Sequence, residues 1–271
     1  MVDRIGEISM KRKENGFAAT GILYTILLVF LALMTTLLAT LSSRSRILEK
    51  LKKDAKSESA EVKNVVYANG IAVFYNPETG KKCTTAVSTP GTNSGCMKWY
   101  AFNDDDKSST VNVILDHNTT AKVAWNLTGN NSEMKEVKKA LENDTSNWKR
   151  DLNPRLIEVN EIAKITKHPT FDARKTGQSW FYLDSNNQTQ TANASNKSKY
   201  AWLFDYTDGC ANYGCNKADS STYGYWTSTS YKDNSTQAWR VDSYGRLNLT
   251  SVSNSVRGIR PVITISKSNI S

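Results

Sequence analysis

Few side chains in this chain of 271 residues are placed to do covalent chemistry. A catalytic nucleophile needs a base and a third group that orients the base. The two histidines, His117 and His168, stand in a turn and before a proline, and we interpret both as structural hydrogen-bonding residues. The chain has no Gly-rich phosphate loop, no HExxH motif and no GxSxG motif. The sequence therefore predicts a protein that is not an enzyme and that carries no cofactor.

The four cysteines form two close pairs, Cys83 with Cys96 and Cys210 with Cys215, and none has CxxC spacing. Structural zinc sites use CxxC or Cys/His clusters, so we expect two short-loop disulfides rather than a zinc site. Disulfides persist in oxidising compartments, and this expectation places the bulk of the chain outside the cytoplasm.

Asp104, Asp105 and Asp106 are the remaining candidates for metal binding. Ca²⁺ prefers several carboxylate and carbonyl oxygens, which neighbouring aspartates can supply. The EF-hand spacing, with its glycine and terminal glutamate, is missing. We therefore predict no metal site and interpret the three aspartates as a solvated hairpin tip.

Noncovalent binding is better supported, by polar and aromatic residues toward the C-terminal end. Alternation with period two points Trp239 and Val241 toward a core, and Arg240 and Asp242 away from it. After a turn at residues 244–245 the alternation continues through a second strand. Tyr and Arg supply contact area and directed donors, while Asn, Thr and Asp adapt to many partners. The predicted ligand-binding residues are Tyr223, Tyr231, Asp233, Asn234, Arg240, Asp242, Tyr244, Arg246, Asn248 and Thr250.

Plain solvation is the alternative interpretation of these residues, because a strand with one wet face shows the same alternation. The residue types favour binding, since ordinary strand surface carries more Lys and Glu, and only Lys232 occurs in residues 225–265. The apolar residues of this region predict a sheet core. They are Trp226, Trp239, Val241, Leu247, Ile259, Val262, Ile263 and Ile265.

Short strands are predicted where apolar runs are followed by turn residues. Such runs occur at residues 71–75, 97–102 and 110–115. A polar, low-complexity loop is predicted at residues 185–199, and the pattern of strands separated by turns resumes after it. Hairpins of antiparallel strands are therefore expected.

Two short helices are predicted among these strands. Apolar residues at helical spacing predict one helix within residues 131–144, capped by Asn131 or Ser132, and another within residues 159–166. Residues 65–271 are thus expected to form one α+β domain of short antiparallel strands, two short helices and long loops.

A long apolar segment dominates the N-terminal part. No charged residue occurs between Glu14 and Arg44, and residues 17–41 exceed the ~20 residues needed to cross a bilayer. The segment is longer than the apolar core of a cleavable signal, and no Ala-x-Ala site follows it, so a retained membrane span is predicted. A basic leader at residues 1–16 precedes the span, and an amphipathic helical extension at residues 42–64 follows it.

The net charge of +9 does not indicate a nucleic-acid partner. Lys and Arg concentrate in residues 44–64 and 135–155, where they alternate with acidic residues on helix faces. No motif of a nucleic-acid-binding module occurs. Basic residues flank the apolar span on both sides, so their count does not decide its orientation.

The segment "MKRKENGFAATGILYTILLVFLALMTTLLATLSSRSRILEKLK" resembles the leader and first helix of type IV prepilins. In that family a peptidase cuts between Gly and Phe, here Gly16 and Phe17, and the new amino terminus is methylated. The resemblance implies the membrane and other pilin subunits as partners. One departure is Gly21, where the family usually has Glu five residues into the mature chain. A plain N-terminal signal anchor is the alternative.

A second resemblance covers residues 65–267. The segments "SWFYLD", "WLFDYTDGCANYGCN", "YGYWTSTSY", "AWRVDSYGRLN" and "GIRPVITISKS" resemble bacterial surface domains of the C-type-lectin-like fold. The relevant branch includes formylglycine-generating enzymes and the variable proteins of diversity-generating retroelements. The Glu-Pro-Asn and Gln-Pro-Asp tripeptides of calcium-dependent sugar binding are absent, and the enzyme branch's catalytic cysteine pair has no counterpart near residues 225–265. The resemblance implies the fold and a binding role, and the polar residues are compatible with retroelement diversification.

These features together predict a bacterial cell-surface, pilin-like protein that is membrane-anchored or pilus-associated. Its extracellular domain is expected to bind an unknown protein or glycan. The alternative function is structural, that of a minor pilin or surface subunit that binds no ligand.

Overall fold

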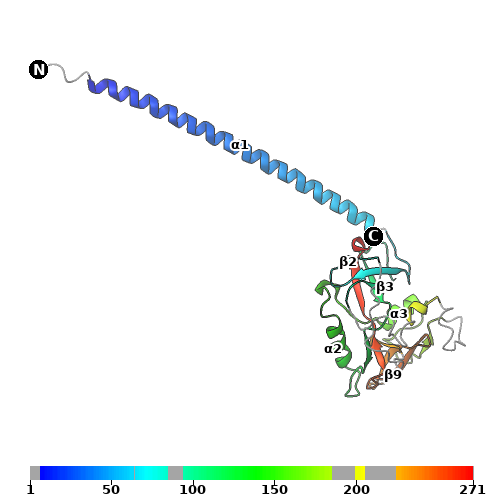
Figure 1. Cartoon of the computed structure of the whole chain (residues 1–271). Helices are drawn as coiled ribbons and strands as arrows, with labels where there is room; N and C mark the ends of the chain where they lie inside the picture. The colour runs from blue at the N-terminus through cyan, green and yellow to red at the C-terminus, as the bar shows by residue number, and fades with distance from the viewer. Residues whose placement is uncertain (1–6, 64, 85–93, 185–198, 205–223, 271) are drawn as a thin grey trace. The chain divides into compact units, whose positions relative to one another are not determined.

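A computed structural model describes residues 7–63, 65–84, 94–184, 199–204 and 224–270. The chain divides into two compact units, residues 1–58 and residues 59–271. The first unit is helical, and the second holds the strands and the short helices (Figure 1). The predicted fold class, a long N-terminal helix followed by an α+β domain, is confirmed.

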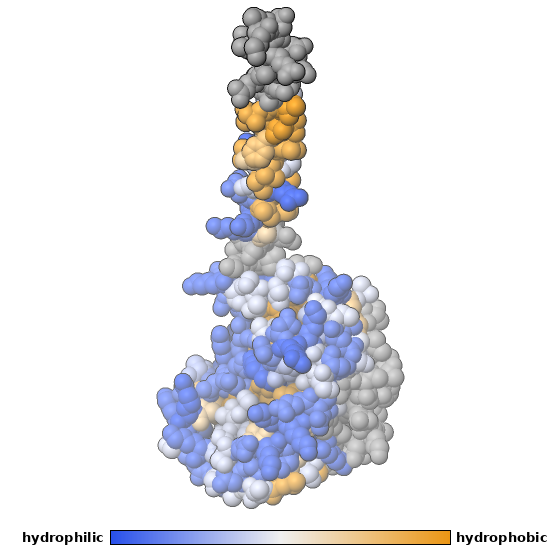
Figure 2. All heavy atoms as spheres, turned by 90° about the vertical axis from the view of Figure 1, so that its left-hand side faces the viewer, coloured by the Kyte–Doolittle hydropathy of each residue, from blue (hydrophilic) through white to orange (hydrophobic). Residues whose placement is uncertain are grey.

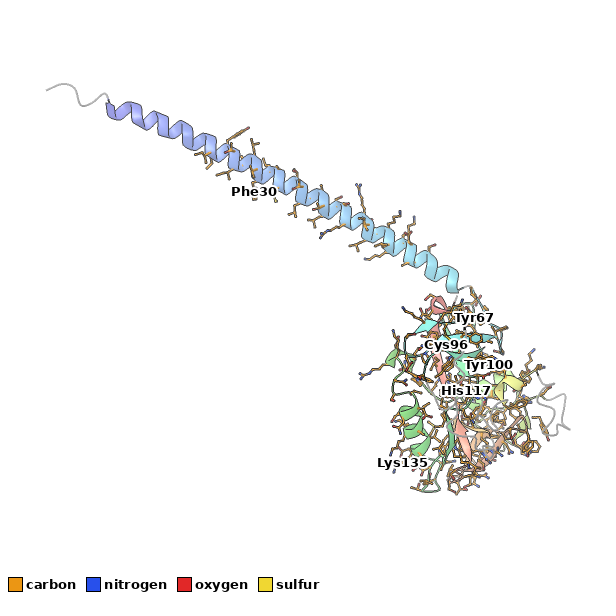
Figure 3. All side chains as sticks on the ribbon, in the orientation of Figure 1. Phe30, Tyr67, Cys96, Tyr100, His117 and Lys135 are labelled. Atoms are coloured by element: carbon orange, nitrogen blue, oxygen red, sulfur yellow. A yellow bond between two sulfur atoms is a disulfide. The ribbon has the colours of Figure 1, made fainter. Side chains whose placement is uncertain are left out.

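Helix α1 runs from Glu7 to Lys63, 57 residues or about 85 Å at 1.5 Å per residue. Its apolar side chains, such as Phe30, are exposed and project outward along the helix (Figure 3). Figure 2 shows an apolar surface over part of this helix, and hydrophilic residues are mixed with apolar ones over the rest of its described part. The part from Gly21 to Ser57 is long and apolar enough to cross a bilayer, a property that signal sequences share. Gly16 and Phe17 fall within the helix, and cleavage between them stays a prediction.

A five-stranded sheet with the order β11-β4-β3-β1-β2 forms one half of the domain, and all its pairings are antiparallel. Apolar residues such as Trp99, Val113 and Ile263 pack into one core cluster beside this sheet. The strands predicted at 97–102 and 110–115 are confirmed, and the one predicted at 71–75 lies one residue later. The bounds are β1 Ala72–Asn76, β2 Lys81–Lys82, β3 Met97–Phe102, β4 Thr110–Leu115 and β11 Val262–Ser266.

A six-stranded sheet with the order β5-β10-β7-β8-β9-β6 forms the other half. Its pairs are antiparallel except β10 with β7, where Gly258 pairs with Tyr225 in parallel. The register shifts within the β7/β8 pair, between Trp226 and Ser230. The bounds are β5 Thr120–Val123, β6 Phe181–Tyr182, β7 Tyr225–Ser230, β8 Gln237–Val241, β9 Arg246–Ser251 and β10 Arg257–Ile259.

Apolar clusters cover both faces of this second sheet. One cluster contains Trp239, and another contains Trp226. The two tryptophans lie on adjacent strands, and alternation sends them to opposite faces. The predicted core is confirmed, because each of its members is buried: Trp226, Trp239, Val241, Leu247, Ile259, Val262, Ile263 and Ile265.

The two predicted short helices are present as α2, Lys135–Asp144, and α3, Val159–Ile165. The predicted cap of α2 was wrong, because the helix begins at Lys135 after Met134 and no side chain caps it. The Asn131 amide instead donates to two backbone carbonyls of the β7–β8 loop and to that of Gln237, the first residue of β8. Short 3-10 turns complete the described elements, at Arg150–Leu152, Ala201–Leu203 and Lys267–Asn269.

The interpretation of Asp104 to Asp106 as a solvated tip was wrong for the first of them. The side chain of Asp104 is 1% exposed and lies 3.0 Å from Nζ of Lys267, whose side chain is fully buried. The Lys267 ammonium also donates to the carbonyl oxygens of Val65 and Asp105, both at 2.6 Å. The pair joins the end of β11 to the β3–β4 loop and to the start of the domain. Asp105 and Asp106 are exposed, as predicted.

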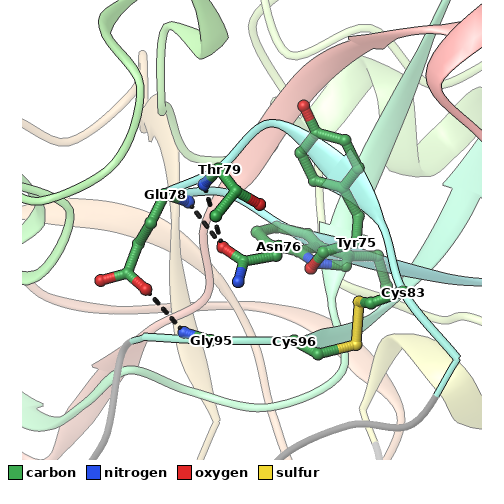
Figure 4. Close-up of a disulfide and its surroundings, with 8 residues drawn as sticks. Tyr75, Asn76, Glu78, Thr79, Cys83, Gly95 and Cys96 are labelled. Atoms are coloured by element: carbon green, nitrogen blue, oxygen red, sulfur yellow. Dashed lines mark hydrogen bonds between the residues drawn. A yellow bond between two sulfur atoms is a disulfide. The ribbon is translucent and has the colours of Figure 1, made fainter.

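The disulfide between Cys83 and Cys96 is present, with its Cα atoms 5.9 Å apart (Figure 4). Beside it, the Glu78 carboxylate accepts a hydrogen bond of 2.9 Å from the backbone N–H of Gly95. The Asn76 side chain accepts the N–H groups of the turn that follows β1. Cys210 and Cys215 lie outside the described residues.

Candidate ligand-binding surface

The turn between β8 and β9 is organised by the carboxylate of Asp242. Its Oδ1 accepts the backbone N–H groups of Tyr244 and Arg246, both at 3.1 Å. Its Oδ2 accepts Nε–H of Arg246 at 2.8 Å and the side-chain amide of Asn248 at 3.3 Å. Gly245 has a φ of +72°, which only glycine adopts without strain. One buried side chain thus fixes the turn that was predicted at residues 244–245.

The predicted orientation of Arg240 and Asp242 toward solvent was wrong. Arg240 is 9% exposed and Asp242 is 1% exposed. The two residues do lie on the face opposite Trp239, as alternation requires, but β8 is an interior strand and both faces of its sheet are covered. Burial, together with the charge of the nearby Arg257 guanidinium, lowers the pKa of Arg240 to about 10, and Asp242 opposes this shift.

Side chains that the sequence did not single out complete a surface around Arg246. Strand β6 pairs with β9, so that Tyr182 lies opposite Arg246. The Arg246 guanidinium carbon lies 5.7 Å from the centre of the Trp180 ring and 5.2 Å from that of Tyr244. Trp180 and Tyr182 pack edge to face, with ring centres 5.4 Å apart. We call Trp180, Tyr182, Tyr244 and Arg246 the aromatic–arginine surface.

This surface remains open to solvent. Trp180 is 48% exposed and Tyr244 is 41% exposed. The side chain of Arg246 is 26% exposed, although the Asp242 carboxylate beneath it is almost fully covered. Asn248 and Thr250 continue β9 as half-buried polar residues. Exposed aromatic rings beside an anchored guanidinium can contact a ligand without changing the fold beneath them.

The residues of the β7–β8 loop that were predicted to bind a ligand mainly make contacts within that loop and with residues 177–178. Tyr231 packs edge to face on Trp239, with ring centres 5.5 Å apart, and its hydroxyl donates to the backbone of Gln178. Asp233 accepts the N–H of Gly177 at 2.7 Å. Asn234 accepts both the N–H and the hydroxyl of Thr236. Tyr223 lies outside the described residues.

Both histidines are engaged in packing. His117 is buried, and its Nδ1 lies 4.0 Å from the Asp116 carboxylate. Burial, together with the charge of Arg260, lowers the pKa of His117 to about 3. The His168 ring stacks on Phe181 at 3.9 Å, and burial lowers its pKa also. These contacts agree with the structural role expected for both residues.

Two open hollows lie away from the aromatic–arginine surface. One, of about 340 Å³, is lined mainly by polar and charged residues, including Arg174 and Lys232. The other, of about 370 Å³, lies between α2 and residues 154–158. Within the described ranges, no group of three or more His, Cys, Asp or Glu residues is placed to hold a metal ion.

No family model, no curated protein and no solved structure matches this chain. The resemblances to type IV prepilins and to C-type-lectin-like domains stay predictions from the sequence.

Proposed function

We propose that this chain is a bacterial, membrane-anchored surface protein whose domain binds a ligand noncovalently at the aromatic–arginine surface. The observation that carries the proposal is the exposure of Trp180 and Tyr244, whose rings both lie within 6 Å of the Arg246 guanidinium. Trp, Tyr and Arg are the residue types that dominate binding energy at protein surfaces. Asn248 and Thr250 add hydrogen-bonding groups beside them.

The support beneath the surface favours binding over plain solvation. Asp242 fixes the turn through two backbone hydrogen bonds, and the adjacent strand carries the fully buried Trp239. A site held by a rigid core loses less conformational entropy when a ligand binds. The aromatic rings are therefore presented in a fixed arrangement.

Other parts of the chain support the proposed anchor and compartment. Helix α1 has the length and composition of a membrane span, and its Gly16-Phe17 dipeptide fits prepilin processing. The disulfide between Cys83 and Cys96 favours an oxidising compartment outside the cytoplasm. We therefore propose that the domain lies on the outer side of the membrane.

The test is a binding screen of the full chain in lipid nanodiscs against a saccharide array and a protein array. We expect Trp180→Ala and Tyr244→Ala to reduce the signal of the bound probe at least ten-fold. Leu127→Ala is the matched control, because Leu127 is an exposed apolar residue on another loop. The proposal fails if both aromatic variants bind as the unchanged chain does.

The second candidate function is that of a minor pilin without a ligand. The uninterrupted helix of 57 residues favours it, since a pilin's first helix must lie in lipid before assembly and pack against its neighbours afterwards. Mass spectrometry of the protein from its native membrane is the test. A mature chain that begins at N-methylated Phe17 supports a pilin of either kind, whereas an intact Met1 supports a simple anchor.

Retroelement diversification of the binding residues is a separate part of the proposal. Asn, Asp, Ser, Thr and Tyr are frequent in residues 228–255, as the resemblance to the variable proteins implies. Sequencing the gene's neighbourhood tests this part. A near-copy template and a reverse transcriptase beside the gene are the expected findings, and their absence contradicts it.

A further inference from the structure

We propose that the aromatic–arginine surface takes an acidic saccharide, and that Arg246 is the residue that selects the acidic group. This inference rests on the proposed function, because it assigns a ligand chemistry to the same surface. It makes two separate claims, one about the carboxylate of the ligand and one about its sugar ring.

The carboxylate claim follows from how Arg246 is held. Among the described residues, the hydrogen bonding of its side chain is confined to Nε, which donates to Asp242 Oδ2 at 2.8 Å. A guanidinium has five N–H donors, so the terminal nitrogens keep theirs for a ligand. Two parallel N–H donors in one plane match the two oxygens of a carboxylate.

The surroundings keep this guanidinium in place. The rings of Trp180 and Tyr244 lie within 6 Å of it, a distance at which the ring face attracts a cation. The Asp242 carboxylate is covered, and both of its oxygens accept hydrogen bonds, so it does not compete for the solvent-facing side of Arg246. Asp242 also lies 3.7 Å from Arg240, so its negative charge is shared between two guanidinium groups.

The aromatic rings of Trp180 and Tyr244 are the reason to expect a sugar ring in the ligand. The face of an aromatic ring is electron-rich and attracts partly positive groups such as the C–H bonds on one side of a sugar ring. Trp180 and Tyr244 offer such faces at an open surface, and neither of the two hollows includes them. A protein partner of standard size covers about 800 Å² on each side and draws on 20 or more residues. Four side chains match one or two sugar rings better.

The experiment compares two oligosaccharides that differ only in the carboxylate. The probes are a β-1,4-linked oligomer of glucuronic acid and the β-1,4-linked glucose oligomer of the same length. Each is titrated calorimetrically into the full chain in lipid nanodiscs. We expect the acidic oligomer to bind at least ten-fold more tightly. Arg246→Gln should lower its affinity to that of the neutral oligomer without changing the affinity of the neutral one.

Two further variants keep the test decisive. Arg246→Lys retains a positive charge beside Asp242 but loses the planar pair of donors, so it should also lose most of the acidic preference while folding as the unchanged chain does. Trp180→Ala should weaken both oligomers together. Thermal unfolding of each variant shows whether it is folded.

The outcomes separate this inference from the proposed function. If Trp180→Ala weakens both oligomers but both Arg246 variants keep the acidic preference, the selection by Arg246 is overturned and the binding surface stands. If neither oligomer binds, but a protein-array signal is lost in Trp180→Ala, the ligand is a protein and the saccharide claim is overturned. If Trp180→Ala and Arg246→Gln both bind the acidic oligomer as tightly as the unchanged chain does, this surface is not the site and both proposals fail.

Discussion

Two buried carboxylates, Asp104 and Asp242, lie in different parts of the domain, and each pairs with a cation in a different way. Asp104 pairs with Lys267 at the end of β11, where both side chains are covered. Asp242 pairs with Arg246 at the start of β9, where the cation is partly exposed. The first pair joins the end of β11 to the β3–β4 loop of the five-stranded sheet, and the second presents a guanidinium at the surface of the six-stranded one. The exposure of the cation separates the pair that supports the fold from the pair that we propose for recognition.

The donor count explains this difference. An ammonium has three donors, and Lys267 uses them on Asp104 and on the carbonyl oxygens of Val65 and Asp105. A guanidinium has five donors, and within the described residues Arg246 gives one of them to Asp242. Lysine is fully used in fixing the fold, whereas arginine is fixed and still has donors for a partner.

The largest loss of stability is expected for Trp239→Ala, because this change leaves a cavity in the core beneath β8 and β9, the strands that flank the Asp242–Arg246 pair. Trp239 is fully buried and packs against Phe171 and Tyr231. Removing so large a buried ring costs about 3 to 5 kcal/mol of the free energy of unfolding. Urea denaturation measures the change. A loss below about 1 kcal/mol contradicts the description of β8 as an interior strand.

Lys267→Met tests the structural ion pair and should cost about 3 kcal/mol, because it leaves the Asp104 carboxylate buried without its cation. Methionine fills much of the volume of the lysine stem, so the loss reports charge pairing more than packing. Lys135→Met is the matched control, since Lys135 is exposed on α2, and it should stay within about 0.5 kcal/mol. Equal effects of the two variants in urea denaturation contradict a structural role for Lys267.

The free energy of unfolding is expected to depend on pH through His117, which lies where the chain passes from one sheet to the other. His117 lies between β4 and β5, and its pKa in the folded state is about 3, below the ordinary 6.5. Below about pH 6.5 the unfolded chain therefore binds a proton that the folded chain does not, and the free energy of unfolding falls as pH decreases toward 3. The slope is at most about 1.4 kcal/mol per pH unit.

The measurement for this effect is urea denaturation at pH values between 7 and 5. His168 contributes with the same sign, because its pKa is also lowered. His117→Asn isolates the share of His117, since asparagine does not take up the proton. The variant should show a shallower fall of stability over this range. Identical pH profiles of the two chains contradict the assignment.

The sequence predicted local features of the candidate site better than its surroundings. Alternation correctly placed Arg240 and Asp242 on one face and Trp239 on the other, and the turn at 244–245 was correct. Whether that face meets solvent depends on residues far along the chain, such as Trp125 and Leu156, which belong to the apolar cluster of Trp226 on the same face of the sheet. The alternation of residues within one strand does not show whether distant parts of the chain pack on its polar face.

The missing half of the surface has the same cause. Trp180 and Tyr182 reach Arg246 only because the two-residue strand β6 pairs with β9, more than 60 positions later. So short a strand has no recognisable alternation, although the aromatic run "SWFYLD" was visible. Lys267 likewise comes directly after the last residue of β11, and only the tertiary fold brings the Asp104 carboxylate to it.

The smallest stability effect, and the sharpest test of the comparison, is expected for Tyr244→Ala. The Tyr244 ring is 41% exposed, and the hydrogen bond that fixes the turn comes from its backbone N–H, which alanine retains. The free energy of unfolding should therefore change by no more than about 0.5 kcal/mol, whereas Trp239→Ala on the adjacent strand costs several times more. Urea denaturation of both variants beside the binding screen gives the answer. A recognition residue changes binding and spares folding, so a Tyr244→Ala variant that loses as much stability as Trp239→Ala contradicts the division between support and recognition.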